Sequence, residues 1–171
     1  SQMPQALARQ PECFLSSVVF GQRLLVLSDA HVGATPSEVE ESLLAFLERA
    51  PTLGDCLLLN GDIFDFWFAY SRLIPRVGFH VAAEIRRVRK RMPVAMVGGN
   101  HDRWGEDFWE RDLDVRFAPV RMELRVGDRR VLAIHGDGVT ESHWSAVLLQ
   151  RITRNPAFVT IWKHAPTAFA F

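Results

Sequence analysis

The chain has 171 residues, of which 48% are hydrophobic, and its 20 basic and 20 acidic residues leave a formal net charge of zero. This length and composition indicate one soluble globular domain with a real core and exclude an intrinsically disordered chain. A zero net charge gives no long-range attraction for nucleic acid, so we expect no nucleic-acid partner. No run approaches the ~18 apolar residues of a membrane span, and the first ten residues lack the apolar core of a signal peptide.

Strands and helices are predicted to alternate through the first part of the chain. Residues 16–20 and 23–27 have the composition of two short strands around a Gly-Gln turn. A helix should follow, with Thr35 as its N-cap, an apolar stripe along one face and an end before Pro51. The next elements are a strand at 56–60, a helix near 81–91 and a strand at 93–98.

The second part of the chain is predicted to contain a short helix in 104–112 and a hairpin in 120–137 that turns at Gly127 and Asp128. From Thr140 the pattern indicates two helices broken at Pro156. The alternation of strands and helices predicts parallel βαβ units and an α/β fold, in which ligands bind beyond the carboxyl ends of the strands. Cys13 and Cys56 lack metal-like spacing, so we expect free thiols in a reducing compartment.

Metal-ligand side chains follow four apolar strands, in the stretches LLVLSDAH, LLLNGDIFD, AMVGGNHD and VLAIHGD. A parallel topology would bring these strand ends to one edge of the sheet. The alternation in DAH would place Asp29 and His31 on the same side of an extended segment. The other stretches supply Asp62 and Asp65, then Asn100, His101 and Asp102, then His135 and Asp137.

Carboxylate, imidazole and amide ligands together suit a borderline-hard divalent ion such as manganese, iron or zinc. Asp62 can bridge two ions through its two oxygens, and two ions ~3.5–4 Å apart can hold a phosphate and generate hydroxide. If Asn100 binds metal, His101 is left to protonate the leaving oxygen, with Asp65 holding its ring. A surface turn or an Asx turn explains each motif alone. The four motifs in this order, each ending an apolar strand, favour the metal site.

The ordered motifs SDAH, GDIFD, GGNHD and HGD resemble the signature of the calcineurin-like metallophosphoesterases over residues 24–137. The resemblance implies an αββα sandwich with a dinuclear centre at the strand ends. Carried over by motif, one ion takes Asp29, His31 and Asp62, and the other takes Asp62, Asn100 and His135. The implied catalytic histidine is His101, supported by Asp65. We expect two divalent ions, manganese first, with iron or zinc as alternatives.

A narrower resemblance is to the UDP-2,3-diacylglucosamine hydrolases of lipid A synthesis, carried by NGDIFDFWF and by HGDGVTESHWSAVLLQRITRNPAF. It implies hydrolysis of UDP-2,3-diacylglucosamine to lipid X and UMP, in the cytoplasm, with peripheral contact at the inner face of the inner membrane. It also implies two parts of the chain: residues 1–140 form the phosphoesterase core, and 141–171 form a helical insertion or lid over the acyl chains.

Two departures from these families affect the prediction. The best-known members of the narrower family have Arg where this chain has His101, which leaves the exact substrate open. The superfamily also closes its site with a late GHTH-type segment, whereas this chain ends in APTAFAF. We therefore expect a fragment, or a protein lacking its C-terminal part, whose 171 residues alone bind metal weakly and are nearly inactive.

Three features outside the ligand motifs have a functional and a structural interpretation. Trp67 and Phe68 either line an acyl chain or pack in the core. Arg151, Arg154 and Asn155 either reach a diphosphate, the arginines by bidentate pairing, or support the packing of their segment. The basic run 86–91 is either a solvated helix face or a contact with anionic phospholipid.

Two other functions stay open. One is a general phosphodiesterase or phosphatase on a soluble nucleotide or other phosphoester substrate. The other is a non-catalytic scaffold of the same fold, which the intact ligand positions and His101 argue against. A nuclease is disfavoured because no basic stripe flanks the motifs. The oligomeric state is not predicted.

Overall fold

The computed structural model describes residues 19–68, 73–105, 107–136 and 155. Their elements are, in chain order, β1 (Leu24–Leu27), α1 (Ser37–Leu53), β2 (Cys56–Asn60), α2 (Phe79–Arg89), β3 (Val94–Val97), the π-helix η1 (Phe108–Asp112), β4 (Arg116–Ala118), β5 (Arg121–Val126) and β6 (Arg129–Ile134). No helix among these residues is long and apolar enough to cross a membrane.

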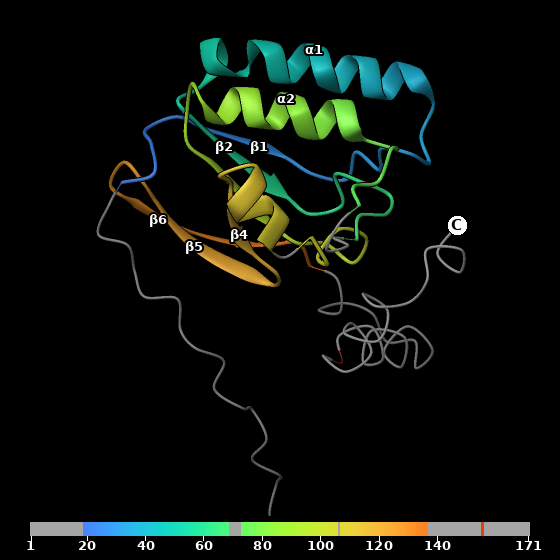
Figure 1. The fold of residues 1–171 in the computed structure, drawn as a ribbon. Helices are drawn as coiled ribbons and strands as arrows, with labels where there is room; N and C mark the ends of the chain where they lie inside the picture. The colour runs from blue at the N-terminus through green and yellow to red at the C-terminus, as the bar shows by residue number, and fades with distance from the viewer. Residues whose placement is uncertain (1–18, 69–72, 106, 137–154, 156–171) are drawn as a thin grey trace, which may run out of the picture.

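The described elements form three layers (Figure 1). The central layer is a parallel sheet with the strand order β1-β2-β3-β4. Helices α1 and α2 cover one face of it, and the antiparallel hairpin of β5 and β6 lies on the other. The prediction of an α/β fold with a parallel sheet is therefore confirmed.

Strand β2 shows why this arrangement needs continuous apolar runs. Leu57 and Leu59 belong to the core beneath the helices, whereas Leu58 belongs to the core shared with the hairpin. All three side chains are at most 3% exposed. A strand covered on both faces has no polar side, which explains the run CLLL.

The two helices bury one stripe each. Helix α1 buries Leu43, Leu47 and Ala50, and α2 buries Val81, Ala82, Ile85 and Val88. These spacings of three and four residues put each set on a single helix face. The predicted ends of α1 were wrong at both termini. Pro36 holds the N-cap position, because the Thr35 hydroxyl donates to the carbonyl oxygens of Ala30 and His31 instead, and the helix continues through Pro51 to Leu53.

Two strand predictions also need correction. Strand β4 was not predicted, and its three residues pair with β3 in parallel. Of the first predicted strand, only residues 19 and 20 are described, and they are not in a strand. The Phe20 N–H donates to the Arg125 carbonyl at 2.7 Å, so this segment lies beside β5. Cys56 is a free, buried thiol, and its burial raises its pKa to about 12.

Candidate metal centre

The loops that follow β1 and β2 run side by side beyond the carboxyl ends of these strands. The N–H groups of Asp29, His31 and Val32 donate to the carbonyl oxygens of Gly61, Asp62 and Ile63 at 3.0–3.1 Å. These bonds continue the pairing of the two parallel strands into the loops. They hold Asp29 and His31 next to Asp62 before any ligand binds.

The backbone at this edge has an uncommon conformation. The φ angles are +57° at Asp29, +45° at His31 and +54° at Asp62. L-residues with a Cβ disfavour this left-handed region, and such residues cluster where a site requires them. The prediction that the DAH stretch is extended was wrong, although both of its ligand-type side chains do reach the same cluster.

Asp62 is the centre of this cluster and is 4% exposed. Two groups of ligand atoms share it, each within 4.8 Å: Asp29, Asp62 and His135, and His31, Asp62 and His101. One Asp62 oxygen lies 3.1 Å from Nε2 of His135 and 3.9 Å from Nε2 of His31. Asp62 is the residue predicted to bridge two ions, and that role stays a prediction. The groups differ from the predicted pairing, in which Asp29 and His31 shared one ion.

His135 reaches the cluster from a different sheet. We expected its strand to end at the same edge of the parallel sheet, but β6 belongs to the antiparallel hairpin. The His135 ring passes so close to Gly61 that a Cβ at that position would lie 2.5 Å from a ring atom. Gly61, with φ of +80°, is therefore required at this crossing.

The contacts of His135 leave a position for a cation beside Asp62. Its Nδ1 lies 2.8 Å from the Asn60 carbonyl, and its Nε2 lies 3.1 Å from an Asp62 oxygen, so both nitrogens face acceptors. A neutral imidazole has only one N–H to donate. A proton or a metal ion must therefore lie between Nε2 and Asp62. Ligand atoms about 2 Å from one ion lie about 3 Å apart, which fits this spacing.

His101 and Asp65 lie together, as the sequence predicted. The His101 Nδ1 is 2.5 Å from the Asp65 carbonyl oxygen and 3.5 Å from its carboxylate. The backbone N–H of His101 donates to the Asp62 carboxylate at 3.0 Å, so the His101 backbone lies against the centre of the cluster. Asp65 also lies 3.8 Å from Nδ1 of His31, whose ring packs edge-on against His101 with centroids 4.9 Å apart.

Asn100 follows β3 in the turn that contains His101, and it is partly buried. The turn packs tightly on Asp62, since a Cβ added to the preceding Gly99 would lie 2.0 Å from an Asp62 oxygen. Both Asn100 and Asp62 therefore belong to one edge of the molecule, as predicted from their motifs.

The sequence analysis counted Asp102 among the ligand-type side chains that follow the strands, and the structure shows that it joins two loops. The side chain is fully buried, and it accepts bonds from the N–H groups of Gly99 at 2.9 Å and Ile63 at 2.8 Å. A third, longer bond comes from the Phe64 N–H. Burial raises the pKa of the Asp102 carboxyl, and these three backbone bonds oppose the rise. Asp102 thus fixes the Asp62 loop to the Asn100 turn.

The predicted apolar wall of Trp67 and Phe68 needs correction. Trp67 is fully buried and packs against Phe64, Phe108 and Trp109, and Phe68 is 4% exposed. Both are accounted for by core packing. Two exposed apolar residues adjoin the site instead: Phe66, which is 43% exposed and follows Asp65 in the chain, and Val77, which is 58% exposed. Val77 lies against the loop that follows β1, since a Cβ added at Gly33 would lie 2.6 Å from a Val77 methyl carbon. The same Cβ would lie 3.9 Å from the Cβ of Asp65.

The predicted diphosphate-binding segment lies almost wholly outside the described residues. Arg151, Arg154 and Asp137 are outside them, as are the two predicted helices after Thr140. Asn155 is described and exposed. Their assigned roles, and the division of the chain at residue 140, stay predictions.

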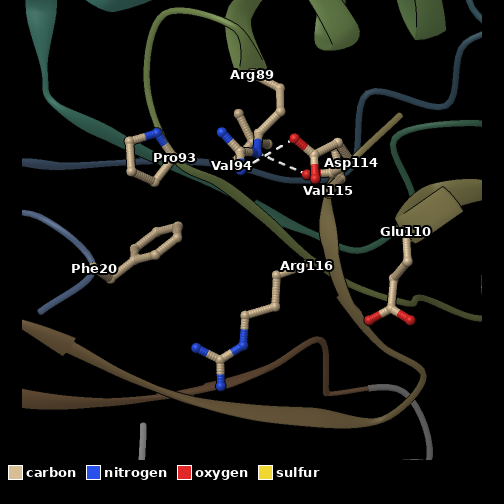
Figure 2. A pocket seen from close by; sticks show the side chains of 8 residues that line it. All are labelled: Phe20, Arg89, Pro93, Val94, Glu110, Asp114, Val115 and Arg116. Carbon is tan, nitrogen blue, oxygen red and sulfur yellow. Dashed lines mark hydrogen bonds and ion pairs between the residues drawn. The ribbon is translucent and has the colours of Figure 1, made fainter. Parts of the chain in front are cut away.

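A hollow of about 350 Å³ lies at the opposite end of the sheet (Figure 2). It is bordered by the first residues of β3 and β4, by Phe20, and by Arg89 and Asp114. The Arg89 Nε donates to the Asp114 carbonyl at 2.7 Å, and its guanidinium lies 3.2 Å from the Asp114 carboxylate. The charges that face this hollow thus include an Arg–Asp pair within the protein.

Comparison with known protein families gives one match that covers most of the chain. The family model described as Calcineurin-like phosphoesterase matches residues 22–169. This range includes every predicted metal ligand.

Similar curated proteins share one name. The UDP-2,3-diacylglucosamine hydrolase of Porphyromonas gingivalis is 28% identical over 140 residues, which are 78% of this chain and 53% of that protein. The protein of the same name in Stenotrophomonas maltophilia is 30% identical over 146 residues, 84% of this chain and 58% of that protein. The chain spans about half the length of the curated relatives that it matches. A solved structure, the nuclease MPE of Pseudomonas putida, is 28% identical with a TM-score of 0.42, covering 57% of this chain and 48% of that one.

Proposed function

The chain belongs to the calcineurin-like phosphoesterase family, and from this premise we propose that it is a metal-dependent phosphoesterase whose catalytic centre is the cluster around Asp62. The observation that carries the proposal is the position of Asp62, which is buried and shared by two groups of ligand atoms. A shared carboxylate is what two neighbouring divalent ions require.

The residues present fit two ions at this edge. Asp29, Asp62 and His135 would hold one, and His31 with Asp62 would hold the other, with Asn100 as a further ligand. Manganese is our first expectation, with iron or zinc as alternatives, because the donors are carboxylates, imidazoles and an amide without a thiolate. When bound, two such ions hold a phosphate, supply a hydroxide nucleophile and offset the charge that develops during displacement.

We assign His101 to proton transfer. Its Nδ1 is held by the carbonyl oxygen and the carboxylate of Asp65, so Nε2 is the nitrogen available to a substrate. Because Nδ1 faces a neutral carbonyl at 2.5 Å, we place the proton of the neutral ring on Nδ1. When Nε2 carries a proton as well, it can donate to the leaving oxygen. Asp65 orients this ring and does not itself touch the reacting atoms.

We propose the diphosphate of UDP-2,3-diacylglucosamine as the substrate, split to lipid X and UMP. Support comes from the names of the similar proteins and from the exposed apolar side chains beside the cluster. Phe66 adjoins Asp65 in the chain, and Val77 lies against the same loop. These two residues replace Trp67 and Phe68 as the proposed acyl-facing wall. Cytoplasmic activity at the inner face of the inner membrane belongs to the same proposal.

A second candidate is a phosphodiesterase or phosphatase that acts on a soluble nucleotide. The burial of Trp67 and Phe68 favours it, because these two residues were expected to line an acyl chain.

The deciding experiment is a substrate comparison with the full-length, manganese-loaded protein. Detergent-solubilised UDP-2,3-diacylglucosamine, UDP-glucosamine without acyl chains and bis(p-nitrophenyl) phosphate would be assayed in parallel. We expect the acylated substrate to be cleaved much faster than the deacylated one. Equal turnover of the two sugar nucleotides would contradict the lipid substrate and support the soluble phosphodiesterase. No turnover of any of the three would contradict the phosphoesterase proposal as a whole.

A further inference from the structure

Asn60 connects the two sheets at the candidate metal centre. It is the last residue of β2, and its side-chain Nδ2 donates to the Ile134 carbonyl at the end of β6 at 3.2 Å. Its own backbone carbonyl accepts the bond from Nδ1 of His135 at 2.8 Å. One residue therefore holds both the last residue of β6 and the histidine that follows it.

The identity of residue 60 is not explained by stability. Three leucines precede it in β2, and its strand neighbour in β3 is the buried Val97. Among the described residues, the Asn60 Oδ1 is buried without a hydrogen-bond partner. An unsatisfied buried acceptor lowers stability, and an apolar side chain of similar size would avoid this loss. The benefit of the amide therefore has to come from its other end, the bond of Nδ2 to Ile134.

The position of His135 depends on where β6 ends. Strand β6 pairs with β5 and, among the described strands, is not in the hydrogen-bonded ladder of the parallel sheet. His135 must nevertheless bring Nε2 to 3.1 Å from Asp62, which follows β2 in that sheet. The ring has little room to move, because it lies directly against Gly61. A small displacement of Ile134 would carry Nε2 away from Asp62 or drive the ring into the backbone.

We propose that Asn60 is a positioning residue of the metal centre. Its side-chain amide fixes the end of β6 to the end of β2, and His135 then presents Nε2 to Asp62. The inference rests on the proposed metal-dependent function, because it treats His135 as a ligand. Mutation of residues that orient a metal-binding histidine from outside the ligand shell typically changes metal affinity about 10–100-fold.

The test is metal affinity combined with stability in the full-length protein. Mn²⁺ and Zn²⁺ binding would be measured by titration calorimetry for wild type, Asn60→Leu and Asn60→Val. Urea unfolding of the metal-free proteins would be measured in parallel. We expect ion affinity to fall about 10–100-fold in both variants, while the metal-free unfolding midpoint stays unchanged or rises. A residue that only supports packing would lower the midpoint and leave the affinity of the folded protein unchanged.

Leu58→Ala is the matched control. Leu58 lies two residues before Asn60 in β2, so the two side chains are on the same face of the sheet. Leu58 belongs to the core shared by the sheet and the hairpin. It should lower the unfolding midpoint without changing metal affinity. A second readout is the ¹⁵N NMR spectrum of the zinc-loaded protein, in which Nε2 of His135 should show the shift of a metal-bound nitrogen in wild type and should lose it in Asn60→Leu.

The outcomes separate this inference from the function on which it rests. Equal metal affinity in Asn60→Leu and wild type would overturn the role of Asn60 and leave the metal centre standing. An affinity loss as large in Leu58→Ala would overturn it too, because general packing would then position His135. If wild type bound no divalent ion, or bound it as tightly as Asp62→Asn does, both the proposed function and this inference would fall.

Discussion

The two ends of the parallel sheet use charged residues in opposite ways. At the amino end, Asp114 pairs with Arg89 (Figure 2), whose guanidinium is 3.2 Å away, and it lies 3.5 Å from the guanidinium of Arg86. At the carboxyl end, the ion-pair distances within the described residues join Asp62 and Asp65 to histidine rings, which carry charge only when protonated. The amino end thus pairs its charged side chains with one another, whereas the carboxyl end brings several carboxylates and imidazoles together.

This difference separates a structural cluster from a candidate ligand site. An Arg–Asp pair satisfies both partners, and surface pairs of this kind need no third component. Carboxylates and imidazoles that converge on one another leave lone pairs facing lone pairs, which requires a cation. Left-handed backbone is more frequent at the carboxyl end, where Asp29, His31 and Asp62 adopt it, than near the amino end, where Asp114 does. Its local cost is acceptable where function demands the geometry. The basic run on α2, for which phospholipid contact was one interpretation, contributes Arg86 and Arg89 to these pairs, and Arg87 pairs with Glu84 of the same helix.

The largest effect is expected at the shared carboxylate. Asp62→Asn should lower turnover by about a thousandfold or more and weaken ion binding, because a neutral amide bridges two cations poorly. Turnover and bound metal would be measured in the same preparation, with Asp114→Asn as the control that removes a carboxylate at the other end of the sheet. Wild-type activity in Asp62→Asn would contradict the dinuclear centre and remove the contrast between the two ends.

The next effect concerns proton transfer by His101. His101→Ala should retain the bound ions and lose ~10²–10⁴-fold in rate. The loss should be smaller for an aryl phosphate, because its leaving group needs little protonation. A loss of metal together with activity would instead make His101 a ligand, as its grouping with His31 and Asp62 allows. An equal loss on both substrates would contradict the acid role.

The sequence predicted the cluster better than it predicted the path of the backbone to it. Each motif follows an apolar run, and strand ends can be located from such runs, so the convergence of Asp29, Asp62, His101 and His135 was expected. The left-handed φ angles of Asp29 and His31 were not, because they are set by bonds to Gly61 and Asp62 in another loop. The spacing of residues along a short stretch of sequence does not reveal a backbone conformation that hydrogen bonds to a distant loop impose.

The same limit explains two other misses. The hairpin and its turn were predicted, yet its place in a second sheet depends on packing against Leu58, Ala95 and Val97, which is not a local property. The sequence of a dense aromatic stretch also does not show which of its side chains face the core and which face solvent. Phe66 points outward while Trp67 joins the Phe64, Phe108 and Trp109 cluster, and only the fold distinguishes these neighbours.

A moderate effect is expected at the apolar surface beside the cluster. Phe66 is 43% exposed and adjoins Asp65, so Phe66→Ala should reduce the preference for the acylated over the deacylated sugar nucleotide about five- to tenfold, since only part of a phenyl ring would be buried by the chain. The ratio of kcat/KM for the two substrates measures it. Leu132→Ala is the control, because Leu132 is an exposed apolar residue in the middle of β6. An unchanged ratio in Phe66→Ala would place the acyl chain elsewhere.

The smallest effect is expected at the internally balanced end, where Asp114 combines exposed ion pairs with a φ of +58°. Its side chain is 59% exposed, and such pairs contribute about 0–1 kcal/mol, so Asp114→Asn should lower the free energy of unfolding by well under ~1 kcal/mol. Asp114→Ala should lower it further, by about 1–2 kcal/mol, because alanine disfavours the left-handed conformation. Asp114→Gly should recover most of that second loss, since glycine adopts this conformation freely. Urea unfolding orders the three variants, and metal titration of the folded proteins should find no change in any of them. A weakened metal affinity in Asp114→Ala would show that the two ends of the sheet are coupled, which their separate charge balance argues against.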